Sequence, residues 1–213
     1  MDTVKIYCGK VSNGKNIVRF SNGFEKIMPV KVYNKTGVFN GMALSFSEAD
    51  FLIEKIEKLI AEEIIIRKLK SRKRTEFEIV NELKKNQISL KVIDAIIEKY
   101  KYLKLIDDND YSRSYINDQV KLNKKPLRKI KNELLLKNID RNIIENAVSD
   151  LKNNCDCLDT DLETCKKLIL KKTHNNIELL NEDHDLKDKI KRFLFNKGFD
   201  YETIKQCFIE LSE

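Results

Sequence analysis

Cysteine and histidine are the first residues to consider for chemistry, because together they form most structural zinc sites. Cys155, Cys157 and Cys165 lie close together, and His174 and His184 follow them along the chain. Structural zinc sites favour cysteine pairs separated by about two to four residues, and this spacing is different. We therefore expect no metal. The five cysteines of the chain, which lacks an export signal, are expected to be reduced thiols.

Groupings of residues that could support catalysis are also missing. The segment GVFNG at residues 37–41 lacks the lysine and hydroxyl residue that complete a phosphate-binding P-loop. Both histidines lie in one polar stretch, and the carboxylates are scattered over the polar faces of helical patterns, where they are usually solvated. We expect that the chain is not an enzyme and uses no cofactor.

Two basic stretches, residues 67–74 and 121–131, are the main candidates for a binding site. A run of like charges is usually a solvated helix face. Here, however, both runs lie at equivalent places in a repeat, so that stacked repeats would align them for an extended acidic partner. The candidate binding residues are Arg67, Lys70, Arg72, Lys73, Arg74, Tyr111, Arg113, Tyr115, Lys121, Lys124, Lys125, Arg128 and Lys129.

Composition is compatible with such a partner. The 213 residues are 41% hydrophobic and 35% charged, and a formal charge of +7 favours nucleic acid or an acidic protein surface. The longest apolar runs are far shorter than a membrane span, and the N-terminus lacks a secretory hydrophobic core. We expect a cytoplasmic protein.

An internal repeat must position the basic stretches. When Leu83, Leu134 and Leu194 are treated as equivalent, apolar residues align on both sides of them, with offsets of 51 and 60 residues. These offsets lie at or beyond the upper end of usual repeat periods, which are about 20–50 residues, so each copy should hold three helices rather than two. The aligned sets are Ile79, Ile130 and Ile190; Ile93, Ile144 and Ile204; and Tyr100, Leu151 and Leu211.

The turn inside each copy supports the alignment. The three turns are 87–89 (QIS), 138–140 (NID) and 198–200 (GFD). Glycine and asparagine accept the left-handed conformation that closes a helix, whereas Gln87 is a weak choice for this role. The last residue of each turn is a serine or aspartate, which can cap the helix that follows.

The chain before the repeats has a different pattern. Residues 4–33 are β-rich, and Asn22-Gly23 predicts a type I′ hairpin turn between two strands. Pro29 should place a strand at the sheet edge or end it. A helical pattern begins at Ser47, with Asp50 three residues later as in a capping box, and it could form one long helix or two.

The sequence thus predicts a mainly α protein: three tandem three-helix repeats that form an elongated, curved solenoid, preceded by a small N-terminal β-hairpin or sheet. The expected segments are 1–45 (β-rich), 46–60 (linking helix), 61–107, 108–158 and 159–213 (repeats), with a polar insertion at 173–185 in the third repeat.

Four stretches carry a resemblance to a known family. They are SRKRTEFEIVNEL, YLKLIDDNDYSRSYI, KKPLRKIKNELLLKNID and NKGFDYETI, which cover parts of all three repeats. Together they resemble the RecX regulatory proteins, which bind and modulate RecA recombinase filaments. Gln87 and Asn138 depart from the family, in which glycine is frequent at these positions, and the insertion in the third repeat is atypical.

This resemblance implies a monomeric clamp that lies in the groove of the RecA–DNA filament and restrains its growth, ATP turnover, strand exchange and repressor cleavage. Direct contact with single- or double-stranded DNA would be weak. An alternative is a helical DNA-binding module, although the helices LKVIDAIIEKY and RNIIENAVSDL offer mostly aliphatic and acidic side chains for reading bases. A purely structural scaffold is a third reading.

Overall fold

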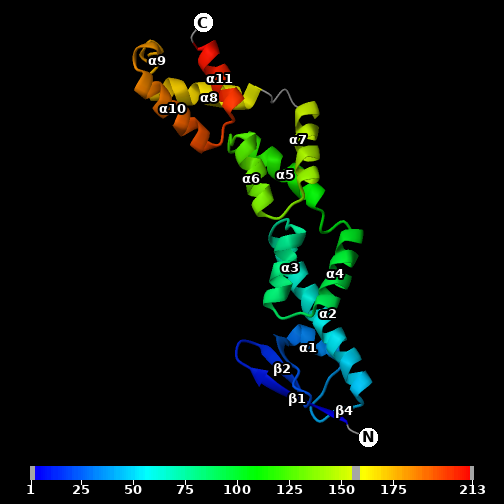
Figure 1. Ribbon diagram of the computed structural model, residues 1–213. Helices are drawn as coiled ribbons and strands as arrows, with labels where there is room; N and C mark the ends of the chain where they lie inside the picture. Colours follow the sequence, from blue (N-terminus) through cyan, green and yellow to red (C-terminus); the bar gives the residue numbers. More distant parts are fainter. Residues whose placement is uncertain (1–2, 155–158, 212–213) are drawn as a thin grey trace. The chain divides into compact units, whose positions relative to one another are not determined.

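The computed structural model describes residues 3–154 and 159–211 (Figure 1). The chain is mainly helical, with a small antiparallel sheet at its N-terminus. It divides into two compact units, Met1–Ile106 and Asp107–Glu213, which are described separately here.

The sheet has four antiparallel strands in the order β3-β2-β1-β4. One face packs on the core of the first unit, where Ile6 of β1, Val18 of β2 and Met28 of β3 are buried. The strands are β1 (Val4–Val11), β2 (Lys15–Phe20), β3 (Glu25–Pro29) and β4 (Ala43–Leu44).

Two turns join the first three strands. The predicted hairpin at Asn22-Gly23 is present, but a type I′ turn is wrong, because Gly23 has a positive φ and Asn22 does not. Four residues, 21–24, instead separate β2 from β3, and Gly23 among them has the left-handed conformation. Asn13 and Gly14, in the preceding hairpin, both have positive φ, a signal that the sequence reading missed.

The strand expected to continue to Tyr33 ends at Pro29. Proline has no N–H to donate to a neighbouring strand, so pairing stops there. The next residues form α1 (Val30–Thr36), whose buried residues Val32 and Thr36 have the four-residue spacing of a helix rather than the alternation of a strand.

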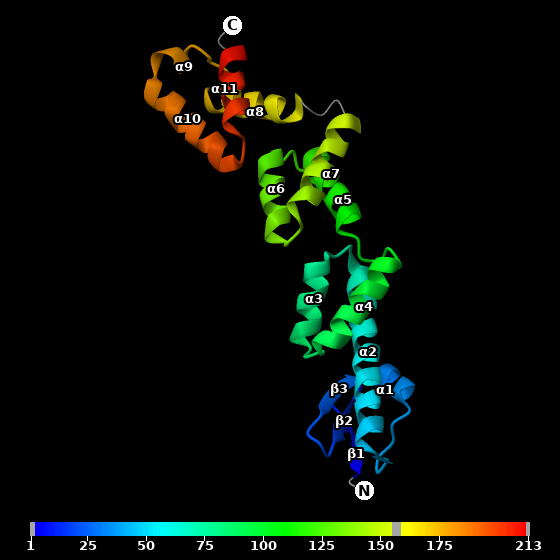
Figure 2. The same cartoon turned by 45° about the vertical axis from the view of Figure 1, so that its right-hand side comes forward.

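A single helix, α2 (Phe46–Ser71), connects the sheet to the first repeat. In both views it runs beside the sheet and then along α3 and α4 (Figure 2). Its capping box is formed by Ser45 and Glu48 rather than by Ser47 and Asp50, because Ser45 has the extended backbone that an N-cap needs. The boundary expected after residue 60 lies inside this helix.

The first repeat is completed by α3 (Glu76–Lys85) and α4 (Leu90–Tyr102). Thr75 caps α3 by accepting a hydrogen bond from the backbone N–H of Glu78. The apolar faces of α2, α3 and α4 share one core with the inner face of the sheet.

The second unit contains the other two repeats, each with its own core. A four-residue helix, α9, lies in the predicted polar insertion and contributes the buried Leu180 to the core of the third repeat. The helices are α5 (Asp108–Lys121), α6 (Leu127–Leu136) and α7 (Arg141–Asn154), then α8 (Asp159–Lys172), α9 (Leu179–Glu182), α10 (His184–Lys197) and α11 (Tyr201–Glu210).

The alignment of the repeats is confirmed at the leucine anchors and at the turns. Leu83, Leu134 and Leu194 are each fully buried. The carbonyl of each accepts a hydrogen bond from the apolar residue of the following turn, at 3.2–3.3 Å, which closes a Schellman motif. The residue before that apolar residue has positive φ in every copy: 55° at Gln87, 59° at Asn138 and 106° at Gly198. Gln87 therefore takes the left-handed conformation despite its side chain.

Candidate partner-binding surfaces

The first basic stretch lies at the end of α2 and before α3. Arg67 and Lys70 are exposed on the last turns of α2, and Lys73 is exposed beyond its end. Arg72 and Arg74 contact the carboxylate of Glu78, at 3.1 and 3.7 Å. These two arginines help to fix the start of α3, so Arg67 and Lys70 are the better placed for a partner.

Three of the candidate residues in the second repeat stabilise the repeat itself. The ring of Tyr111 is buried and stacks on that of Tyr115, with 5.9 Å between centroids. The Tyr115 hydroxyl donates a hydrogen bond to Glu133 at 2.7 Å, and the Lys125 ammonium donates to the same carboxylate at 3.0 Å. This network joins α5 to α6 from within.

The network also explains the two pKa shifts at its centre. Burial, followed by the hydrogen bond to Glu133, raises the pKa of Tyr115. Burial acts to raise the pKa of Glu133 as well, but hydrogen bonds from Tyr115 and Lys125 outweigh it and lower that pKa. The sequence did not reveal Glu133, because its partners lie 18 and 8 residues away.

Two further arginines join helices. Arg113 donates a hydrogen bond to Asp150 at 2.8 Å, linking α5 to α7. The guanidinium of Arg128 lies 4.1 Å from the ring centroid of Phe195, so it bridges the second and third repeats by a cation–π contact. Both side chains are thus engaged within the second unit.

The remaining candidates are Lys121, Lys124 and Lys129, which are exposed at the connection between α5 and α6. The structure therefore groups the candidate residues into two exposed sets: Arg67, Lys70 and Lys73 in the first unit, and Lys121, Lys124 and Lys129 in the second. Each set lies around the junction of the first and second helices of its repeat, so the two sets occupy equivalent places, as the alignment predicted.

A groove of about 420 Å³ lies beside the second set, between α6, α7 and the turn before α11. Its lining combines three cations and two acids, Glu145 and Asp200, with an apolar floor that includes Leu135 and Val148. Glu145 pairs with Lys131 at 2.7 Å. Arg141 belongs to it because it follows the turn directly and faces α6. The sequence analysis missed this residue, which stands alone rather than in a run. The cations are Arg128, Lys131 and Arg141.

Chemistry beyond binding has little support in the described part of the chain. Residues 3–154 and 159–211 contain no group of three cysteine, histidine or acidic side chains that could hold a metal ion. Cys165 and Cys207 are buried in the third repeat, and both histidines are exposed. Cys155 and Cys157 lie outside the described residues, so the absence of metal stays a prediction. Within the same ranges, helices long and apolar enough to cross a membrane are not found.

The fold and these surfaces define a class: a protein of three-helix repeats that presents exposed cations. Comparison with known proteins identifies the family. Residues 107–148 match the second three-helix domain of RecX, and residues 159–208 match the third. The regulatory protein RecX of Prosthecochloris aestuarii is 31% identical over 134 residues, covering 63% of this chain and 82% of that protein. The chain belongs to the RecX family of regulatory proteins.

Other matches agree with this assignment. The regulatory protein RecX of Finegoldia magna is 37% identical over 134 residues, and the match spans 62% of either chain, less than two thirds of that relative. The crystal structure of RecX from Lactobacillus salivarius has a TM-score of 0.60 at 28% identity, covering 73% of this chain and 97% of that one. A second RecX crystal structure, at 22% identity and a TM-score of 0.61, supports the fold over 95% of this chain.

Proposed function

We propose that this protein binds the RecA–DNA filament in the cytoplasm and modulates it, mostly by inhibiting ATP hydrolysis, strand exchange and coprotease activity. Such a role would place it in homologous recombination, DNA repair and the SOS response. Membership of a family whose members are named regulatory proteins supports a regulatory role. The described residues offer binding surfaces and little that could support catalysis.

The observation that carries the proposal is the repetition of exposed cations around the junction of the first and second helices in two successive repeats. Repeat proteins bind extended partners by adding many small contacts along their surface. A filament of protein and DNA presents both acidic side chains and phosphates, which lysine and arginine side chains can approach. Binding should therefore weaken as salt is added.

ATP hydrolysis by a cognate RecA on single-stranded DNA provides the test. We expect a substoichiometric amount of this protein to lower the rate, because one copy that caps or bridges a filament affects many RecA subunits. The triple variant Lys121→Glu, Lys124→Glu, Lys129→Glu should weaken this inhibition without loss of helical structure, since all three side chains are exposed. Lys125 and Arg128 are left unchanged because they stabilise the second unit.

A charge-matched control separates a specific surface from bulk charge. The triple variant Lys171→Glu, Lys189→Glu, Lys205→Glu changes the net charge equally, at exposed positions of the third repeat. It should inhibit nearly as well as the parent protein. Equal loss in both variants would refute the choice of surface. No inhibition by the parent, together with tight binding to duplex DNA at physiological salt, would replace the filament proposal by the DNA-binding module.

A further inference from the structure

The two faces of the N-terminal sheet differ sharply. Helices α1 and α2 cover one face, whose side chains are buried. On the other face, the strand register places Tyr7 beside Arg19, and Gly9 beside Ile17, which itself pairs with Ile27. Tyr7 is 51% exposed and Ile27 is 50% exposed. We call this the outer face of the sheet.

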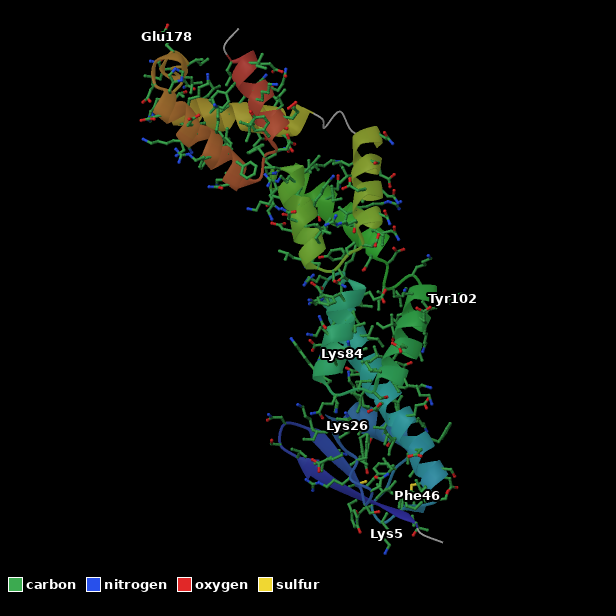
Figure 3. All side chains as sticks on the ribbon, in the orientation of Figure 1. Lys5, Lys26, Phe46, Lys84, Tyr102 and Glu178 are labelled. Atoms are coloured by element: carbon green, nitrogen blue, oxygen red, sulfur yellow. The ribbon has the colours of Figure 1, made fainter. Side chains whose placement is uncertain are left out.

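Cations surround the aromatic ring on the outer face. Lys5 precedes Tyr7 by two residues on the same strand, so both project to the same side, and Lys5 is exposed (Figure 3). Arg19 and Lys15 lie on β2, about 13 Å apart along the strand. The acid on this face is Glu25, which pairs with Arg19.

The charge of the whole chain is concentrated in this half. Residues 3–45 contain six lysines and one arginine but a single acid, Glu25. Residues 1–106 carry 21 basic and 13 acidic side chains, whereas residues 107–213 carry 20 and 21. The net charge of +7 thus comes from the first unit, and the sheet segment, residues 3–45, carries a net charge of +6.

We infer that the outer face of the sheet binds single-stranded nucleic acid. A nucleobase would stack on the exposed ring of Tyr7 and on the exposed apolar surface of Ile27, while Lys5, Lys15 and Arg19 contact the flanking phosphates. Single-strand binding proteins combine these two elements, a positive track for the backbone and an aromatic platform for the bases.

The choice of nucleic acid over an acidic protein rests on the combination of groups. An acidic peptide could pair with the cations, but it offers no flat ring at regular intervals to stack on Tyr7. Each nucleotide supplies both a base for stacking and a phosphate for the cations. Gly9, which has no side chain, keeps the surface next to Tyr7 low; an added Cβ would lie 3.2 Å from Ile17. This inference needs no recombinase and stands apart from the proposed function.

Fluorescence anisotropy of a labelled oligothymidylate of about twenty nucleotides, titrated with the full chain, tests the inference. Tyr7→Leu keeps an apolar side chain but removes the ring, and we expect it to weaken binding at least about fivefold. Lys15→Glu should weaken binding and reduce the slope of log affinity against log salt by about one. Lys35→Glu is the matched control: Lys35 is exposed on α1, away from the outer face, and its reversal should have much less effect.

Several outcomes would overturn the inference. One is unchanged binding by Tyr7→Leu together with equal losses for Lys15→Glu and Lys35→Glu, which would indicate attraction by bulk charge. A second is competition by polyglutamate as strong as that by unlabelled oligothymidylate, which would point to an acidic protein. A third is a dimer that Tyr7→Leu dissociates, which would assign the face to a second copy of the chain. Circular dichroism and urea unfolding of each variant check that the sheet is folded, and Tyr7→Phe should restore binding.

Discussion

The turn between the last two helices of the first repeat differs from the corresponding turns of the other two. In the second and third repeats, the aspartate of the turn caps the next helix by accepting from backbone N–H groups: Asp140 from Asn142 at 2.8 Å and Asp200 from Thr203 at 2.7 Å. In the first repeat, Ser89 accepts no such bond. Its own N–H donates to Glu57 of α2, at 3.1 Å, and its hydroxyl donates to the same carboxylate.

The N-terminal sheet extends this difference. The ammonium of Lys26, on β3, lies 3.8 Å from Glu57 and donates to the carbonyls of Asn86 and Gln87 at the end of α3. Both charged side chains are about nine-tenths buried, and Lys26 lies between the sheet and the repeat (Figure 3). The sheet therefore closes the turn of the first repeat, whereas the turns of the second and third repeats are closed by their own residues.

The largest effect on stability should come from the buried leucine that precedes each of the three turns. Leu134→Ala should lower the free energy of unfolding by about 2–5 kcal/mol, through lost burial and the cavity left behind. Leu136→Ala, two residues away at an 84% exposed position, should change it by less than about 0.5 kcal/mol. Urea unfolding measures both. Similar values for the two variants would refute the alignment of the repeats.

Removing the carboxylate that closes the first turn should have the next largest effect. Glu57→Ala leaves the N–H of Ser89 without its acceptor and Lys26 without its anion, and we expect a loss of about 2–4 kcal/mol. Hydrogen exchange should also quicken in the sheet, because the link to the repeat is gone. Glu98→Ala, at an exposed position of α4, is the control. Unchanged protection in the sheet would contradict the link described above.

The turns were predictable because their signals are local. Leucine, an apolar turn residue and a capping residue recur within seven positions in each copy, and the second and third copies also have a residue tolerant of left-handed backbone, Asn138 or Gly198. The Glu57–Ser89 contact spans 32 residues, and the contacts of Lys26 with α3 span 60 and 61. Local patterns carry no information about such contacts, so the different closure of the first turn could not be foreseen.

The candidate site shows the same division. The sequence indicated where positive charge accumulates, and the structure places Arg67, Lys70 and Lys124 at exposed positions. The sequence did not distinguish these exposed residues from Lys125 and Tyr115, which form hydrogen bonds with Glu133 inside the repeat. Composition near a turn is similar in both cases, and only the packing of α5 against α6 separates an exposed candidate from a structural residue.

The third repeat can be tested through its glycine. Gly198 has a φ of 106°, and a Cβ added there would lie 2.7 Å from the Cβ of Lys129 in the second repeat. Gly198→Val should lower the free energy of unfolding by about 1–3 kcal/mol from backbone strain, with a further loss from this clash. Gly41→Val is the matched control, because Gly41 also has positive φ but its Cβ would meet open space. Equal losses would show that contact with Lys129 contributes nothing.

Exchanging the capping residues tests the difference between the first and third turns, with smaller expected changes in the free energy of unfolding. Asp200→Ser keeps a capping oxygen, so it should cost only a few tenths of a kcal/mol, about 0.3. Ser89→Asp introduces the capping residue that the second and third repeats use. It should nevertheless lower stability by about 1 kcal/mol or more, because it places a second carboxylate against the buried Glu57. Thermal and urea unfolding of both exchanges provide the measurement. A stabilising Ser89→Asp would mean that the first turn is closed like the others.

The smallest effect should be a dependence on pH that belongs to the first turn. Burial lowers the pKa of Lys26 from its usual value of 10.5, although the charge of Glu57 offsets part of this. Just below pH 10.5 the unfolded chain therefore binds more protons at this residue than the native chain, so stability gains as pH rises through that window. Lys26→Met lacks this gain.

The stability of the parent protein relative to Lys26→Met should accordingly increase between about pH 7 and pH 10 in urea unfolding. Lys35→Met, at an exposed position of α1, is the control for the general effect of losing a lysine. The stability of the parent protein relative to Lys35→Met should change little over the same pH range. A parent protein that instead loses stability relative to Lys26→Met over this range would show that the attraction of Glu57 exceeds the cost of burial. The pair would then be a net stabilising ion pair, and the sheet would hold the first turn by charge rather than by hydrogen bonds to its carbonyls.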